Sequence, residues 1–300
     1  MKSDRRAALG WIGMGQIGTP MVLRLIAAGH DVTVWGRNKA RLAVALAAGA
    51  REAPSAAQVA ARSDAVFLCV LDDAAVEDVV FGAAGVAEGA RPGTPIVDHS
   101  TIHPHSAVAF ASRLAASSLS WVDAPVSGGP GGAADGTLSV FLGGEANDVE
   151  RVRPWLGAYA RNVTHFGAVG TGQMAKACNQ AVVCATVAIW AEALTLARDN
   201  GLDGAQLVAA LGGGWADSRI RAALAPAMAT RTSPVRSLAI FLKDLDIVAD
   251  VARAHRSPTF LSGAVASLFR SAERGSGSGG LDGLMEFYAD GASSGDAKAR

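Results

Sequence analysis

A glycine-rich turn near the start of the chain constrains the fold most strongly. Residues 7–12 form a short apolar run typical of a buried strand, and Gly13-Met14-Gly15-Gln16-Ile17-Gly18 follows at once. A helix with Pro20 in its first turn is predicted for residues 19–28, and Asp31–Trp35 has the pattern of a second strand. This order of elements is the βαβ unit that binds the pyrophosphate of a dinucleotide, the alternative being a turn with a purely structural role.

Each glycine of this turn has its own physical task. The first permits a tight turn, the second lets the backbone approach a pyrophosphate, and the third lets helix and strand pack closely. The N-terminus of the helix attracts the phosphate charge. The residues expected to contact the cofactor here are therefore Gly13, Met14, Gly15, Gln16, Ile17 and Gly18.

The end of the second strand indicates which dinucleotide binds. An NAD site would place Asp or Glu here to hold the ribose hydroxyls, whereas the chain has Gly36-Arg37-Asn38-Lys39. Arg37 can pair with a 2′-phosphate, and this stretch contains no carboxylate that would repel one. We therefore expect NADP(H) to be preferred over NAD(H), with Arg37 and Asn38 at the cofactor. An ordinary exposed arginine in a turn is the alternative.

Further strands alternate with helical segments and predict a parallel sheet covered on both faces. These strands are expected at residues 65–70, 95–98, 119–123 and 138–142. In open α/β sheets the turns at the carboxyl ends of the strands line the ligand crevice. The turns expected there are Leu71–Asp73, Ser100–Pro104 and Ala124–Gly132. The last of these offers unhindered backbone N–H groups and a hydroxyl, which suit a substrate carboxylate.

A single long helix is predicted from Thr171, a plausible N-cap, to a stop at Gly201. About 28 residues would give a rod of about 42 Å, long enough to connect two domains. Residues 181–191 are apolar nearly all round, so we expect them to be buried on several sides. The uncharged run is too short for a membrane span.

Lys176, Asn179 and Gln180 place an ammonium and two amides on one face of this helix. From spacing alone, Lys176 is equally well interpreted as a surface lysine.

The second half of the chain shows only helical patterns, at residues 205–211, 220–228, 238–254 and 260–273. The predicted architecture is therefore α/β, with a doubly wound Rossmann domain, a long interdomain helix and an all-α C-terminal domain. The expected boundaries are 1–168 for the NADP-binding Rossmann domain and 169–300 for the all-helical domain, which begins with the long interdomain helix.

Composition excludes several classes of function. Lys plus Arg and Asp plus Glu both number 27, so neither nucleic acid nor an anionic membrane surface is an expected partner. The spacing of His99, His103 and His105 matches no zinc pattern, no metal is expected, and no GxSxG supports a hydrolase. The N-terminus does not have the pattern of a signal peptide. The three cysteines are interpreted as reduced core thiols, and the protein is expected to be cytoplasmic.

Five ordered motifs together resemble the β-hydroxyacid dehydrogenase family, which includes 3-hydroxyisobutyrate dehydrogenase, tartronate semialdehyde reductase and the glyoxylate/succinic semialdehyde reductases. These motifs are Gly13–Met21, Asp98–Pro104, Asp123–Gly129, Gly170–Gln180 and Lys243–Leu245. They cover nearly the whole chain. Ile17 and Cys178 depart from the usual residues of the family, and both remain apolar.

The resemblance implies a role for each residue of the site. Lys176 would be the catalytic lysine and Asn179 its neighbour that orients the substrate. Ser127, Gly128 and Gly129 would bind the substrate carboxylate. Thr101 and Lys243 would border the nicotinamide and the substrate, and Leu71 belongs to a turn expected at the same end of the cofactor.

The implied activity is hydride transfer between a nicotinamide and a short 3-hydroxy acid or semialdehyde acid, with tartronate semialdehyde (2-hydroxy-3-oxopropionate) the closest expectation. Oxidation of 3-hydroxyisobutyrate and reduction of glyoxylate or succinic semialdehyde are alternatives. Imine reductases of the same fold commonly have Asp or Tyr at the lysine position, so Lys176 argues against that activity. A non-catalytic NADP-binding interaction protein is the alternative from another class. The resemblance also implies a homodimer or homotetramer, with residues 169–300 as the substrate and dimerisation domain.

Overall fold

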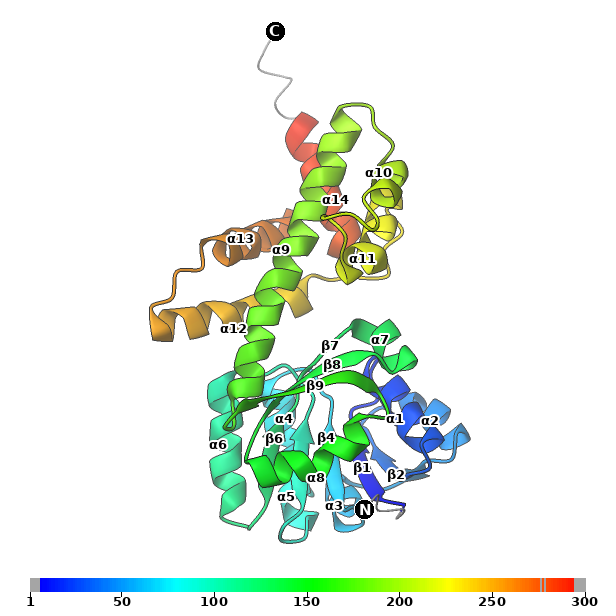
Figure 1. Ribbon diagram of the computed structural model, residues 1–300, viewed down its shortest axis with the longest axis vertical. Coiled ribbons are helices and arrows are strands. Elements are labelled where there is room, and N and C mark those ends of the chain that lie inside the picture. Colours follow the sequence, from blue (N-terminus) through cyan, green and yellow to red (C-terminus); the bar gives the residue numbers. More distant parts are fainter. Residues whose placement is uncertain (1–5, 276, 278, 294–300) are drawn as a thin grey trace. The chain divides into compact units, whose positions relative to one another are not determined.

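The chain forms two compact units, residues 1–176 and 177–300. The computed structural model (Figure 1) describes residues 6–275, 277 and 279–293. The predicted boundary between residues 168 and 169 lies before the long helix, whereas the two units divide inside that helix, after Lys176. Most of the N-terminal stretch that argued against a signal peptide lies outside the described residues.

The first unit is built on one mixed β-sheet. Its strands are β1 Ala8–Ile12, β2 Asp31–Trp35, β3 Arg51–Glu52, β4 Ala65–Leu68, β5 Pro95–Asp98, β6 Ser120–Asp123, β7 Val126–Ser127, β8 Leu138–Gly143 and β9 Ala160–Gly167. Strands β3-β2-β1-β4-β5-β6 run parallel in that spatial order, while β8 is antiparallel to β6 and β7 and parallel to β9. The order reverses between β1 and β4, which creates the crevice of a doubly wound fold.

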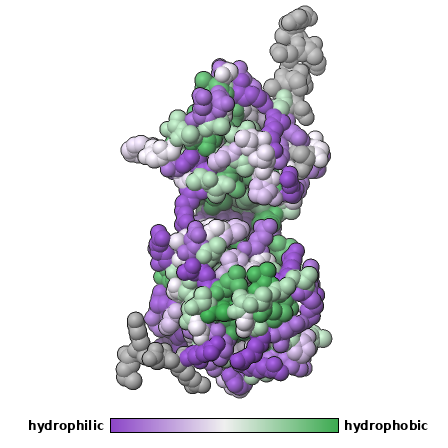
Figure 2. Space-filling model, turned by 90° about the vertical axis from the view of Figure 1, so that its right-hand side faces the viewer, coloured by the Kyte–Doolittle hydropathy of each residue, from purple (hydrophilic) through white to green (hydrophobic). Residues whose placement is uncertain are grey.

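Helices cover both faces of this sheet, as predicted. They are α1 Gly18–Ala27, α2 Ala43–Ala47, α3 Ala56–Ala61, α4 Asp73–Phe81, α5 Val86–Gly89, α6 Pro104–Ala115, α7 Gly129–Asp135 and α8 Ala146–Leu156. One core joins α1, α2, α7 and α8 to one face, and a second joins α3 to α6 to the other. Successive strand residues alternate between them, so that Trp11 enters the first core and Ile12 the second. Figure 2 shows an apolar surface patch on this unit, on the side where α1 and α2 lie.

Three strands of the sheet are missing from the sequence-based prediction. β3 and β7 have two residues each, too few for a periodic pattern to emerge. β9 has eight residues, but much of it is exposed and polar, so it lacks the apolar run that revealed the inner strands.

The long helix is α9, Thr171–Asp199, and its N-terminus is held by a residue other than the one predicted. Thr171 is the first helical residue, and its hydroxyl donates to the carbonyl oxygen of Ala168 at 2.8 Å, so it is not the N-cap. The buried Asp123 carboxylate at the end of β6 instead accepts hydrogen bonds from Gly170 N at 2.8 Å and Gln173 N at 2.9 Å. A carboxylate at this position satisfies the first N–H groups and complements the helix dipole.

The middle of α9 is less buried than its composition predicts. Val182, Ile189 and Leu196 recur every seven residues and are exposed by 67%, 57% and 68%, so one apolar stripe of the helix faces solvent. Cys178 is also exposed, contrary to the expectation of three core thiols. By length and composition alone α9 is able to cross a membrane, but core helices of water-soluble proteins meet the same two criteria, so this is weak evidence.

All regular secondary structure in the described residues of the second unit is helical. The second part of α9 is joined there by α10 Gly204–Ala210, α11 Arg219–Thr230, α12 Ala239–His255, α13 Phe260–Gly275 and α14 Gly280–Ser293. Their core gathers apolar side chains such as Trp190, Leu245, Phe269 and Leu284. Four of these helices match the predicted segments closely, whereas α14 was not predicted because a Gly/Ser-rich stretch precedes it.

Candidate active site

The three glycines of the first turn differ in their surroundings as the dinucleotide motif requires. Gly13 has a φ of +107°, and a Cβ there would lie 2.1 Å from the carbonyl oxygen of Cys69. A Cβ on Gly18 would lie 2.1 Å from the carbonyl oxygen of Gly13. A Cβ on Gly15 would meet no atom within 4 Å, so this glycine leaves open space at the end of the turn before α1. The residues therefore fit a pyrophosphate held by backbone N–H groups.

Arg37 and Asn38 lie just beyond β2, where the cofactor ribose is expected. Arg37 is exposed, and its Nη1 lies 3.8 Å from Oδ2 of Asp78 on α4. The sequence around Arg37 could not reveal this carboxylate, which comes from a distant segment. The Asn38 side chain accepts a hydrogen bond from Ala40 N at 3.1 Å and so caps the short 3-10 helix Lys39–Leu42.

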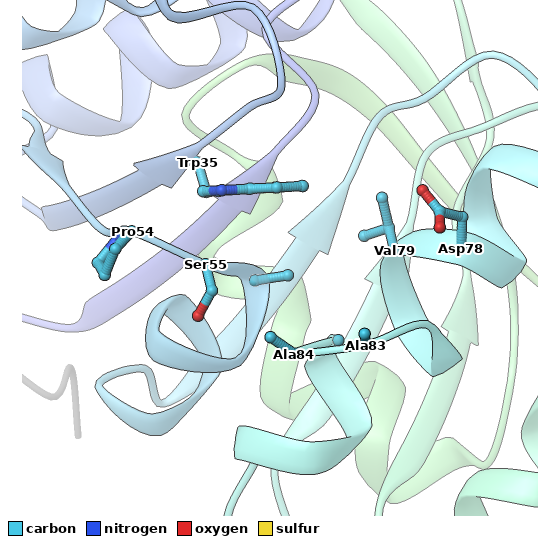
Figure 3. A pocket seen from close by; sticks show the side chains of 9 residues that line it. Trp35, Pro54, Ser55, Asp78, Val79, Ala83 and Ala84 are labelled. Carbon is cyan, nitrogen blue, oxygen red and sulfur yellow. The ribbon is translucent and has the colours of Figure 1, made fainter.

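A cavity of about 250 Å³ lies beside the end of β2. Its lining residues are Trp35, Pro54, Ser55, Ala56, Asp78, Val79, Ala83, Ala84 and Gly85. Figure 3 shows the Trp35 ring on one side of the cavity, with Val79 and Asp78 on the other and Ala83 and Ala84 below. Trp35 comes two residues before Arg37, and Asp78 lines the cavity while also contacting Arg37. The Trp35 ring and the neighbouring guanidinium suit the base and ribose of an adenine dinucleotide.

The other predicted residues of the first unit lie at the carboxyl ends of the parallel strands. Leu71 is exposed and precedes Asp72, the N-cap of α4, and Thr101 is half-buried beyond β5. Ser127 ends β7 and pairs in register with Ser139 of β8. Gly128 and Gly129 follow with φ values of +131° and +64° and begin the short helix α7. The parallel sheet thus places Leu71 and Thr101 on the same side as the glycine turn.

The start of α9 is hydrogen-bonded to the turn that carries Thr101. The Gln173 side chain donates from Nε2 to the carbonyl oxygen of Ser100 at 2.8 Å and accepts from Ile102 N at 3.3 Å through Oε1. Lys176 follows Gln173 by three residues in the same helix and is buried. Its burial excludes the alternative of an ordinary surface lysine.

Two buried titratable residues, Asp98 and His99, come immediately before this turn in the chain. Asp98 stands in register beside Asp123, and burial raises its pKa to about 7 despite hydrogen bonds from Ser100. The next residue, His99, has its pKa lowered to about 4 by burial. Its Nδ1 lies 2.6 Å from the carbonyl oxygen of Ala124, and its Nε2 lies 2.9 Å from the hydroxyl of Tyr159. Nδ1 therefore carries the proton in a neutral ring, which anchors the end of β5.

In the second unit a side-chain network connects Asn179 with Lys243. Asn179 Nδ2 donates to Gln180 Oε1 at 2.8 Å, and Gln180 Nε2 donates in turn to Asp244 Oδ2. Lys243 Nζ lies 2.9 Å from Asp244 Oδ1. Gln180 and Asp244 are buried, so the two predicted site residues of this unit are joined through two side chains that have no solvent competition.

Several of these residues were not assigned a role from the sequence. Asp123 and Gln173 hold α9 to the sheet, Gln180 and Asp244 hold Asn179 and Lys243, and Asp78 faces Arg37. Gln173 carried a usable signal, because it precedes Lys176 by three residues and so lies on the same side of the helix. Within the described residues no group of three or more His, Cys, Asp or Glu side chains is arranged to hold a metal ion.

The chain matches two family models that together cover nearly all of it. Residues 8–170 match the NAD binding domain of 6-phosphogluconate dehydrogenase. Residues 170–284 match the model described as NAD-binding of NADP-dependent 3-hydroxyisobutyrate dehydrogenase. Together with the glycine turn, the matched models define an NAD(P)-dependent oxidoreductase that acts on CH–OH donors.

Known proteins narrow this class to one family. The chain is 39% identical over 249 residues to 2-hydroxy-3-oxopropionate reductase of Escherichia coli (strain K12), covering 82% of this chain and 84% of that protein. It is 33% identical over 270 residues to NAD-dependent L-serine dehydrogenase of Pseudomonas aeruginosa, covering 87% and 91%. A crystal structure of 3-hydroxyisobutyrate dehydrogenase from Salmonella typhimurium superposes with a TM-score of 0.87 at 30% identity, covering 94% and 99%. The chain belongs to the 3-hydroxyisobutyrate dehydrogenase family of β-hydroxyacid dehydrogenases, as the sequence motifs predicted.

Proposed function

We propose that this protein is an NADP(H)-dependent reductase of short semialdehyde acids, with 2-hydroxy-3-oxopropionate (tartronate semialdehyde) as its substrate. The observation that carries the proposal is the buried Lys176, held one helical turn beyond Gln173 and the turn that contains Thr101. The 39% identity to a 2-hydroxy-3-oxopropionate reductase supports the choice of substrate. Glyoxylate, succinic semialdehyde and 3-hydroxyisobutyrate are the next candidates.

The residues of the chain have distinct tasks in this reaction. A bound NADPH supplies the hydride that reduces the aldehyde carbon. During the reduction, negative charge develops on the carbonyl oxygen. The ammonium group of Lys176 stabilises this charge and then donates a proton to the oxygen. In the reverse direction Lys176 accepts the proton as the alcohol is oxidised. The backbone of Gly128 and Gly129 and the Ser127 hydroxyl bind the substrate carboxylate. Asn179 orients the substrate, and Thr101 and Lys243 border the reacting groups.

The preference for NADP(H) rests on Arg37. A guanidinium forms strong charge-assisted hydrogen bonds with a 2′-phosphate, and the strand before it ends without the carboxylate of an NAD site. Asp78 opposes this preference, because its carboxylate lies 3.8 Å from Arg37 and repels a phosphate. The relative from Pseudomonas aeruginosa is named as NAD-dependent, so both cofactors are represented among proteins similar to this one.

We also propose that the protein is a homodimer or homotetramer in the cytoplasm. The exposed stripe of Val182, Ile189 and Leu196 on α9 is an apolar surface of the kind that a second copy covers in symmetric oligomers. The three free cysteines agree with a reducing compartment. The mass in solution tests the assembly, and Ile189→Glu should dissociate it while leaving cofactor affinity unchanged.

The proposed activity is tested by following NADPH absorbance with tartronate semialdehyde, succinic semialdehyde, glyoxylate and a cyclic imine, each repeated with NADH. We expect one acid aldehyde to be reduced fastest, with NADPH as the better cofactor. Arg37→Met should weaken NADPH binding about 10- to 100-fold and leave NADH binding unchanged, because one charge-assisted pair contributes about 1.5–3 kcal/mol. Arg41→Met is the matched control, because Arg41 is a second exposed arginine and lies in the 3-10 helix that follows the turn.

Two results would contradict the proposal. Reduction of the imine together with inactivity on every acid aldehyde would assign the protein to imine chemistry. NADPH binding without turnover of any compound on the panel would favour a non-catalytic NADP-binding protein.

A further inference from the structure

We infer that Gln173 is a positioning residue of the reaction, which fixes the turn carrying Thr101 against Lys176. The inference rests on the proposed function, since it assigns Gln173 a task in the same site. Gln173 is buried, with 1% of its surface exposed, and it lies in the first turn of α9.

The side-chain amide of Gln173 is hydrogen-bonded to the backbone on both sides of Thr101. Its Nε2 donates to the carbonyl oxygen of Ser100, the residue before Thr101, at 2.8 Å. Its Oε1 accepts from the N–H of Ile102, the residue after Thr101, at 3.3 Å. Because a backbone carbonyl only accepts and a backbone N–H only donates, the orientation of the amide is unambiguous. The turn therefore cannot move at Thr101 without breaking both hydrogen bonds.

The backbone of Gln173 is held as firmly as its side chain. Its N–H donates to Asp123 Oδ2 at 2.9 Å, and Gly170 N donates to the other oxygen of the same carboxylate at 2.8 Å. A Cβ on Gly172 would lie 2.4 Å from the carbonyl oxygen of Phe141, and one on Gly143 would lie 2.6 Å from Asp123 Oδ2. The first turn of α9 is thus packed directly on the sheet and has no room to slide.

The turn itself is tied to the strands from its other side. Ser100 N donates to Asp98 Oδ1 at 2.9 Å, and Val70 N donates to the Ser100 hydroxyl oxygen at 3.0 Å. Gln173 consequently links a turn fixed to β4 and β5 with a helix fixed to β6. Lys176 lies three residues further along that helix, so Gln173 sets its position relative to Thr101.

Such a link matters because hydride and proton transfer are sensitive to small displacements. A misplacement of about 1 Å can lower a rate about 100-fold, even when no reacting group is altered. A purely structural glutamine, which only satisfies two buried backbone groups, would instead change the free energy of unfolding and leave the chemical step untouched.

The test compares three variants of the full-length protein. Gln173→Met keeps the size of the side chain and removes both hydrogen bonds. Gln173→Glu keeps the acceptor and regains a donor only when its carboxyl group is protonated. Gln206→Met makes the same change at an exposed position of α10 and is the matched control. Each variant is measured for melting temperature, NADPH affinity by fluorescence, kcat and KM for tartronate semialdehyde, and the isotope effect with NADPH deuterated at the transferred hydrogen.

We expect Gln173→Met to lower kcat about 10- to 100-fold with NADPH affinity and KM nearly unchanged. The isotope effect should rise because hydride transfer becomes rate-limiting. Relative to the wild type, Gln173→Glu should recover activity as the pH falls, whereas the Gln173→Met ratio should not depend on pH. A folded Gln173→Met protein with wild-type kcat and isotope effect would overturn the inference.

The inference and the proposed function fail in different ways. If the wild-type protein reduces no acid aldehyde, the proposed function is wrong. Amide hydrogen exchange then tests whether Gln173 holds the turn that carries Thr101, and this measurement needs no enzymatic activity. Exchange at the Ile102 amide should accelerate in Gln173→Met and remain unchanged in Gln206→Met. Unchanged exchange at Ile102 would show that Gln173 does not hold the turn.

Discussion

The two units of this protein position their candidate site residues in different ways. In the first unit the backbone positions the candidate site residues, because the glycine turn, Thr101 and Ser127–Gly129 all lie at or just beyond the carboxyl ends of strands in one sheet. In the second unit Asn179 and Lys243 lie on different helices and are joined through the side chains of Gln180 and Asp244. Function in the first unit should therefore be sensitive to a Cβ added to the backbone, and function in the second unit to the loss of one polar side-chain atom.

The largest effects are expected where the backbone forms the cofactor site. Gly15→Val adds a side chain into open space, so the melting temperature should hold while NADPH binding weakens about 100-fold through lost contacts with the pyrophosphate. Gly13→Ala puts a Cβ 2.1 Å from the Cys69 carbonyl oxygen at a φ of +107°. It should destabilise the fold by about 3 kcal/mol.

Thermal unfolding and NADPH titration of the two glycine variants check this contrast. Equal loss of stability in both would show that the turn is a structural feature without space for a phosphate.

A smaller effect is expected from the side-chain network of the second unit. Asp244→Asn keeps the shape of the side chain but removes the charge that faces Lys243 at 2.9 Å. We expect kcat/KM for the acid aldehyde to fall about tenfold, since a charge-assisted pair contributes about 1.5–3 kcal/mol. Asp246→Asn is the control, because Asp246 lies on the same helix as Asp244 and its ion pair with Arg270 of α13 is exposed. Similar losses in both variants would mean that the network does not position Lys243.

The smallest effect on activity is expected from the two buried residues before the Thr101 turn, which act instead on how stability depends on pH. The pKa of Asp98 is raised to about 7 by burial, so the folded state retains a proton that the unfolded chain releases, and stability falls between about pH 4 and pH 7. The pKa of His99 is lowered to about 4, which makes stability rise with pH between about 4 and 6.5. In the wild type these two slopes oppose each other.

Asp98→Asn removes the falling slope and leaves that of His99. The free energy of unfolding, measured with urea from pH 4 to pH 7, should then increase with pH by about 4 kcal/mol more than in the wild type. Parallel curves for the two proteins would show that Asp98 does not titrate in this range.

The sequence predicted those features that depend on local pattern. The inner strands, the glycine turn and the long helix each carry an apolar run or a spaced motif, and all three are confirmed. The glycine motif indicated its own function because backbone geometry alone creates a phosphate site. β9 was missed because it is largely exposed and polar.

The contacts between distant segments were not predictable in this way. Asp123 caps a helix that begins almost 50 residues later in the chain, so Thr171 was chosen wrongly on local grounds. Asp78 approaches Arg37 from another helix, and no local pattern reveals that pairing. The exposed stripe of α9 was expected to be buried, because an apolar helix looks the same whether its own chain or a second copy covers it.

The proposed role of Lys176 in proton transfer is tested by single-turnover oxidation of bound NADPH by tartronate semialdehyde in wild type and Lys176→Met. We expect unchanged NADPH affinity and a rate about 1,000-fold lower in the variant, within the range of general acid catalysis. Lys176→Met protein that oxidises NADPH at the wild-type rate would contradict it.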